Sequence, residues 1–77
     1  MTPDEALATI HAALEKALDK KVAVTPGTDL FADKILDSLD TMIFFLTLEE
    51  LSGAKFPDKD LQAAGLNKVS KIIEHLA

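Results

Sequence analysis

The sequence predicts an all-α fold: a small bundle of about four helices, three long and one short, mostly antiparallel and with a long first loop. Three observations support this. Apolar residues recur at helical spacing in three segments, helix-capping residues stand at the ends of those segments, and the one candidate strand has no partner. The 77 residues, 48% of them hydrophobic, suit a single globular domain spanning 1–77.

The first helix is predicted to begin at Pro3. Thr2 is a good N-cap, Pro3 suits the first helical position, and Glu5 completes a capping box. Lys20 and Lys21 near its end suit the negative end of the helix dipole. An apolar stripe follows the helical repeat and marks the face turned to the core: Leu7, Ile10, Leu14 and Leu18.

Residues 22–36 are predicted to form a long loop. The segment 22–24 could be a short strand, but it has no partner strand, and Thr-Pro-Gly at 25–27 is a turn signal. Four apolar residues are expected to pin the loop to the bundle: Leu30, Phe31, Ile35 and Leu36. A loop of this length in a small domain needs a functional reason.

The second helix is predicted to run from Ser38 to Ser52, with Asp37 as N-cap and Gly53 just beyond its end. Asp40, three residues after Asp37, completes a carboxylate version of the capping box. Ser38 therefore falls in the first turn, beside unpaired backbone N–H groups and the positive end of the helix dipole. Such a site suits a phosphate ester on a serine.

Apolar residues on the second helix form two stripes on roughly opposite sides. The core stripe consists of Phe44, Leu48 and Leu51, with Phe45 at its edge. The outer stripe consists of Leu39, Met42, Ile43 and Leu46. In so small a bundle we expect the outer stripe to be at least partly exposed, as a candidate partner surface bordered by Glu49 and Glu50. The alternative is a central helix buried on both sides.

Two further elements are predicted toward the C-terminus. A brief helix over about 58–64 would be capped by Asp58 or Asp60 and ended by Gly65. The last helix would follow Asn67 as its N-cap. Its core stripe is predicted to hold Val69, Ile72, Ile73 and Leu76.

Composition excludes several classes of function. The net charge of −5 would repel the phosphates of a nucleic acid and attract a basic protein surface. Without a cysteine, the chain forms neither a disulfide nor a thiolate zinc site, and thiol chemistry would need an imported prosthetic group. The start is acidic, unlike a signal peptide, and no apolar run could span a membrane, so we expect a cytoplasmic protein without membrane insertion.

The acidic residues do not form a known metal motif. An EF-hand needs alternating oxygen ligands, a central glycine and a terminal bidentate glutamate, and the chain has none of these. We therefore expect no metal site and leave weak cation binding open. The aspartates in question are Asp29, Asp33, Asp37 and Asp40.

A hydrolase built on Ser38 is not expected. Such an enzyme needs a base within hydrogen-bond reach of the serine and an oxyanion hole. His11 and His75 fall on other helices, His11 on an expected solvated flank, and no Gly-x-Ser-x-Gly elbow is present. We expect a protein that is not itself an enzyme.

The centre of the chain resembles the acyl carrier proteins. Asp-Ser-Leu at 37–39 follows a long loop, Asp40 comes next, and an apolar helix ends in Leu-Glu-Glu at 48–50. In that family the serine of this motif carries a 4′-phosphopantetheine arm, derived from coenzyme A, and the long loop delivers the serine to its helix. The resemblance thus implies attachment at Ser38, an acyl-carrier-like fold, and acyl intermediates held as thioesters for fatty acid, specialised lipid or polyketide biosynthesis.

The resemblance also implies partners and further site residues. A monomer would meet a phosphopantetheinyl transferase and acyl-transferring, condensing or ligase enzymes whose docking sites are basic and apolar. The residues expected to recognise partners are Asp37, Leu39, Asp40, Met42, Ile43, Leu46, Glu49 and Glu50. The residues expected to line an acyl-chain interior are Phe31, Phe44, Phe45, Leu48, Phe56 and Ile72.

The chain departs from the family pattern in two places. Many fatty-acid carriers have Glu at the position of Ile43, so a dedicated partner set is expected here. Many members have a glycine shortly before the motif, where this chain has Lys34-Ile35-Leu36. Two alternatives remain: an aminoacyl or peptidyl carrier of the same fold, and a helical protein-interaction module without a prosthetic group.

Overall fold

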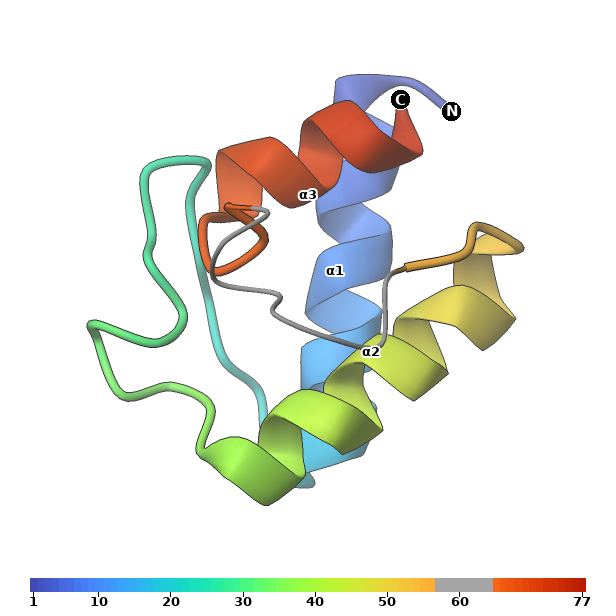
Figure 1. Cartoon of the computed structure of the whole chain (residues 1–77). Helices are drawn as coiled ribbons and strands as arrows, with labels where there is room; N and C mark the ends of the chain where they lie inside the picture. Colours follow the sequence, from blue (N-terminus) through green and yellow to red (C-terminus); the bar gives the residue numbers. More distant parts are fainter. Residues whose placement is uncertain (57–64) are drawn as a thin grey trace.

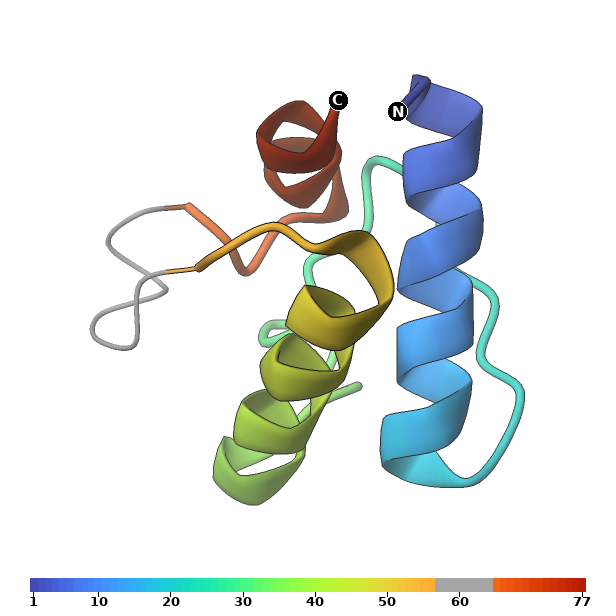
Figure 2. The same ribbon diagram turned by 90° about the vertical axis from the view of Figure 1, so that its right-hand side faces the viewer.

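Three α-helices make up the regular structure in a computed structural model that describes residues 1–56 and 65–77. They are α1 (Pro3–Leu18), α2 (Ser38–Ser52) and α3 (Val69–Leu76). In Figure 1, α1 stands upright, α2 crosses its lower half, and α3 lies across its upper half. Figure 2 shows α2 running alongside α1 in the opposite direction. Both α2 and α3 pack on α1, which is therefore the centre of the fold.

The predicted bundle of four helices is wrong. The described residues contain three helices, and only two of them are long, because α3 has 8 residues. It also lies crosswise to α1 rather than antiparallel to it (Figure 1). The brief helix expected over 58–64 falls outside the residues that the structure describes.

The start of α3 is fixed by contacts outside the helix. Its N-cap is Lys68, without a capping side chain, and the predicted cap Asn67 bonds elsewhere. Instead, the N–H groups of Val69 and Ser70 each donate 3.0 Å hydrogen bonds to carbonyl groups of residues 28 and 26 in the loop between α1 and α2. Loop carbonyls thus satisfy the N–H groups that a helix leaves unpaired at its start, and they fix where α3 begins.

The N-terminal cap of α1 follows the prediction. The side chain of Thr2 accepts a 3.2 Å hydrogen bond from the Glu5 N–H, and Glu5 accepts a 3.0 Å bond from the Thr2 N–H. The helix ends at Leu18, and the next residue, Asp19, has a left-handed φ of 55°. Four residues of α1 are buried, and two of them are alanines that allow neighbouring helices to approach closely: Ala6, Ile10, Ala13 and Leu14.

The core forms where the three helices meet. Its largest fully buried side chains come from all three helices and from the first loop, which spans residues 19–37: Ile10, Leu14, Leu30, Phe44, Leu48, Val69 and Ile72. Within the described residues there is no strand, only an isolated antiparallel bridge between Asp29 and Lys68. The possible strand at 22–24 is not formed.

The first loop is tied down at two places. Its early part is held by the imidazole of His11 in α1, whose Nε2 lies 3.1 Å from the Val24 nitrogen and 3.2 Å from the Val24 oxygen. Its middle part bonds to the residues that precede and open α3. The loop therefore climbs from the end of α1 to the start of α3 and descends again to α2 (Figure 1). Among the described helices, none is long and apolar enough to cross a bilayer.

Candidate functional site

Ser38 is the first residue of α2, as predicted, and it is exposed. The carboxylate of Asp37 caps the helix by accepting a 2.8 Å hydrogen bond from the Asp40 N–H. The reverse bond of a capping box, from the Asp37 N–H to the Asp40 side chain, is not formed. The Ser38 hydroxyl has no hydrogen-bond partner among the described residues, so its oxygen is available at the positive end of the helix.

The outer stripe of α2 is exposed. The exposed fractions are 63% for Leu39, 59% for Met42 and 56% for Leu46, and Ile43 is the most covered at 38%. The alternative of a helix buried on both sides is therefore wrong. The expected role of these residues in partner recognition stays a prediction.

The core stripe is buried at three of its four positions. Phe44 and Leu48 are fully buried, and Phe45 is 6% exposed. Leu51 was expected to face the core, but it is 43% exposed and lines a shallow surface groove with Ala12 and other residues near the end of α1. It lies in the last turn of α2, where the core no longer covers the helix.

The acidic residues of α2 have different surroundings. Asp37 and Asp40 flank Ser38 and leave an acidic border at the start of the outer stripe. Glu50 is exposed near the other end. Glu49 is half-buried, and its Oε2 accepts a 2.8 Å hydrogen bond from the Phe56 N–H. Glu49 therefore has a structural task in fixing the chain that leaves α2.

The residues expected to line an acyl-chain interior are brought together. Five of them belong to one buried cluster, and Phe31 packs against its edge. The Phe45 ring lies 4.9 Å from the Phe44 ring and 5.2 Å from the Phe56 ring. This series of aromatic contacts links α2 to the chain that follows it.

Sequence reasoning missed one member of this series. The His75 ring stacks on Phe56 with 4.4 Å between ring centres, and its Nε2 lies 2.7 Å from the Lys55 carbonyl oxygen. His75 thus ties the last turn of α3 to the chain after α2. Because the partners lie about 20 residues away in sequence, helical spacing contained no signal for this contact.

The histidines do not assemble a catalytic group with the serine. The Nε2 of His11 is bound to the backbone of Val24, so His11 is half-buried rather than on a solvated flank. The ring of His75 is bound to Lys55. Within the described chain, no hydrogen bond joins Ser38 to either ring, so a base for a serine nucleophile is not in place there.

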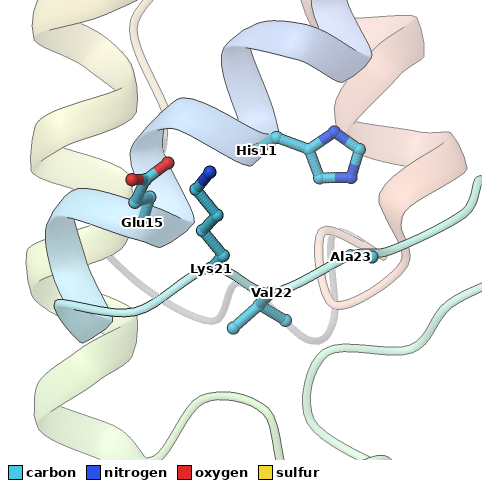
Figure 3. A pocket seen from close by; sticks show the side chains of 5 residues that line it. All are labelled: His11, Glu15, Lys21, Val22 and Ala23. Atoms are coloured by element: carbon cyan, nitrogen blue, oxygen red, sulfur yellow. The ribbon is translucent and has the colours of Figure 1, made fainter.

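A small pocket lies beside His11 (Figure 3). Its walls are His11 and Glu15 of α1 and the segment 21–23, and the Lys21 side chain extends between Glu15 and His11 in Figure 3. The volume is about 220 Å³, below the range of about 300–1,000 Å³ that small-molecule sites occupy. The imidazole Nε2, the best ligand-binding atom here, is already engaged with Val24.

Lys34 occupies the loop position where the backbone turns toward α2. Its φ of 56° is left-handed, a conformation that costs a residue with a side chain roughly 1–2 kcal/mol. Glycine would avoid this cost but would lose more entropy on folding, by about 0.5–1 kcal/mol. Lysine therefore takes here the kind of backbone conformation for which glycine is best suited.

Lys34→Gly is expected to raise the free energy of unfolding by about 0.5 kcal/mol, the difference between these two effects. Urea unfolding followed by circular dichroism measures the change. Lys20→Gly is the matched control, because Lys20 is exposed and its φ is not positive, and it should lower the free energy of unfolding. A loss of stability in both variants would contradict the strain assigned to Lys34.

No family model, no curated protein and no solved structure matches the chain. The features of the chain that bear on its function are therefore the serine, the stripe beside it and the loop that presents them.

Proposed function

We propose that this protein is an acyl carrier that bears a 4′-phosphopantetheine arm on Ser38. The observation that carries the proposal is an exposed serine at the first position of α2, next to an exposed apolar stripe on the same helix. The serine offers an acceptor oxygen, and the stripe offers a surface on which a modifying enzyme docks. The absence of cysteine means that a carrier of thioesters must obtain its thiol from such an arm.

In the proposed reaction, Ser38 contributes only the oxygen that accepts the phosphopantetheine group. Its Oγ forms a bond to the phosphorus of the pantetheine half of coenzyme A, the pyrophosphate bond breaks, and adenosine 3′,5′-bisphosphate leaves with the electron pair. The hydroxyl proton passes to a base of a separate, Mg²⁺-dependent transferase. Unpaired N–H groups in the first turn of α2 favour the negative charge of the phosphodiester that results. The attached arm supplies a thiol on which acyl groups are carried as thioesters.

The surface around Ser38 suits enzymes with an apolar and basic docking site. The outer stripe is apolar, its border holds Asp37, Asp40 and Glu50, and α2 contains no basic residue. Charge complementarity therefore favours Lys and Arg on the partner. We place this carrier in the cytoplasm, with fatty acid, specialised lipid or polyketide intermediates as its cargo.

Met42→Glu is expected to raise the KM of a broad-specificity phosphopantetheinyl transferase for this protein about tenfold, the equivalent of about 1.4 kcal/mol of docking energy. A buried contact in the complex would acquire an unpaired charge, whereas the isolated protein would be unaffected because Met42 is 59% exposed. Initial rates at varied protein concentration measure KM, and circular dichroism checks the fold.

Ala8→Glu is the control for Met42→Glu. Ala8 is exposed on α1, so the variant gains the same charge outside the outer stripe. Its KM should stay within about twofold of the original protein. An equal rise in KM for both variants would assign the effect to net charge and would remove the outer stripe from the docking surface.

The proposed function is tested by the intact mass of the purified protein, before and after incubation with coenzyme A, Mg²⁺ and the transferase. A gain of one phosphopantetheine, mapped by fragmentation to Ser38, is the expected result. A folded protein that starts unmodified and gains no mass would reject the carrier. It would favour a helical interaction module that docks a partner through the outer stripe alone.

A further inference from the structure

The carboxylate of Asp29, in the middle of the first loop, uses both of its oxygens. Its Oδ1 accepts hydrogen bonds from the N–H groups of Phe31 at 3.0 Å and Ala32 at 2.9 Å. Its Oδ2 accepts a 2.8 Å bond from the side-chain amide of Asn67. The backbone carbonyl of Asp29 accepts a fourth bond, from the Asp33 N–H at 3.0 Å. Asp29 therefore organises the whole turn that follows it.

Asn67 is the partner that fixes this turn in the fold. With 9% exposure it is the one buried polar side chain among the described residues, and a buried amide needs hydrogen bonds to offset its loss of water. Besides donating to Asp29, it accepts a 2.7 Å bond at its backbone carbonyl from the Leu30 N–H. Two adjacent loop residues are thus bound to one residue 38 positions away from Asp29.

In the contact between Asp29 and Asn67, the carboxylate of Asp29 carries a negative charge. The N–H of Ala32 in the first place, and then those of Phe31 and the Asn67 amide, hold the pKa of the Asp29 carboxyl below its ordinary value. The group is therefore ionised at neutral pH. Hydrogen bonds to an ionised acceptor are about twice as strong as those between neutral groups.

The turn leads directly to the serine. The carbonyl of Leu30 accepts hydrogen bonds from the N–H groups of Ile35 at 3.0 Å and Leu36 at 3.1 Å. Both leucines are buried, and Leu36 is followed at once by Asp37 and Ser38. A continuous path of bonded or buried residues thus runs from Asn67 before α3 to the N-terminus of α2.

We propose that Asp29 and Asn67 are positioning residues for modification of Ser38: they hold the loop that presents the serine. The inference rests on the proposed function. The transferase selects molecules in which the serine and the outer stripe have the right relative placement. If the loop is loosened, the competent fraction falls, and the apparent affinity falls by the same factor.

Asp29→Asn tests the pair. The new amide can keep an oxygen toward the turn, but its contact with Asn67 loses the charge of the carboxylate, and any bond that remains is one between two neutral amides. We expect KM for the protein to rise about tenfold, as the loss of a charge-assisted hydrogen bond implies, while kcat changes less than about twofold. The assay is transfer from coenzyme A by the broad-specificity transferase, at a temperature where circular dichroism finds all variants folded.

Two further variants sharpen the test. Asp33→Asn removes the same charge from the same turn, but the exposed Asp33 side chain has no hydrogen-bond partner in the described chain, so its KM should be unchanged. The exchange Asp29→Asn with Asn67→Asp restores one donor and one acceptor with reversed polarity. The exchange should bring KM back to within about threefold of the original value.

The outcomes separate the two proposals. An original protein that accepts no phosphopantetheine would reject the carrier function and this inference with it. If the original protein is modified but Asp29→Asn and Asp33→Asn have the same KM, the carrier function stands and the positioning role of Asp29 and Asn67 is overturned. In that case a lower melting temperature of Asp29→Asn would leave the pair a purely structural role. Should the exchange variant fail to fold, the comparison of the two single variants still decides.

Discussion

Ser38→Ala is expected to accept no phosphopantetheine under conditions that modify the original protein completely. Alanine lacks the oxygen that would bond to phosphorus, and no neighbouring hydroxyl replaces it. The Oγ1 of Thr41, the next hydroxyl along α2, donates a 2.6 Å hydrogen bond to the Asp37 carbonyl and is half-buried. Intact mass of the variant after prolonged incubation measures the loss.

The variant should fold normally, because Ser38 is exposed and the cap of α2 is provided by the Asp37 side chain. A stability change within about 0.5 kcal/mol is expected. Ser70→Ala is the matched control, since the half-buried Ser70 contributes its backbone N–H, not its side chain, to the bond with residue 26. Full modification of that control and none of Ser38→Ala is the expected pair of results. A mass gain in Ser38→Ala would move the attachment site elsewhere.

Local signals in the sequence predicted α1 and α2 well. The capping box at Thr2 and Glu5, the cap at Asp37 and the glycine after Ser52 each act within four residues. The left-handed φ of 75° at Gly53, whose N–H bonds to the Glu49 carbonyl, is such a local stop. These signals do not depend on the rest of the fold, so they could be read without it.

The fold near α3 could not be predicted in this way. Asn67 is of a residue type that favours the N-cap position, but its contact with Asp29 and its burial decide its role. The start of α3 is determined by carbonyl groups that lie about 40 residues earlier in the chain. Propensity indicated a capping residue at position 67, but the side chain of Asn67 binds Asp29 in the first loop instead of capping α3.

The candidate site was predicted unevenly for the same physical reason. Two apolar stripes on α2 follow from its spacing, and the exposure of the outer one was a sound expectation for a small domain. Leu51 was misplaced because spacing gives the direction of a side chain and not the extent of the core beyond the helix. Asp29 was identified only as an acidic residue, since its three donors come from the turn and from Asn67.

Phe44→Ala is expected to lower the free energy of unfolding by about 3–5 kcal/mol, the cost of removing a buried aromatic ring and leaving a cavity. Phe44 is fully buried, is the largest such side chain in the described core, and packs edge-on against Phe45 at 4.9 Å between ring centres. Natural domains have only about 5–15 kcal/mol of stability, so most of the margin would be lost. Urea unfolding followed by circular dichroism measures it.

Leu46→Ala is the matched control for Phe44→Ala. Leu46 stands two residues further along the same helix, but it is 56% exposed, so truncation should cost no more than about 0.5 kcal/mol. Comparing the free energies of unfolding of the two variants tests whether α2 has one buried side and one exposed side. Similar losses in both would mean that the outer stripe is covered in solution, and a covered stripe could not dock a transferase beside Ser38. A large loss of stability for Phe44→Ala alone would agree with an outer stripe that is exposed and free to bind a partner.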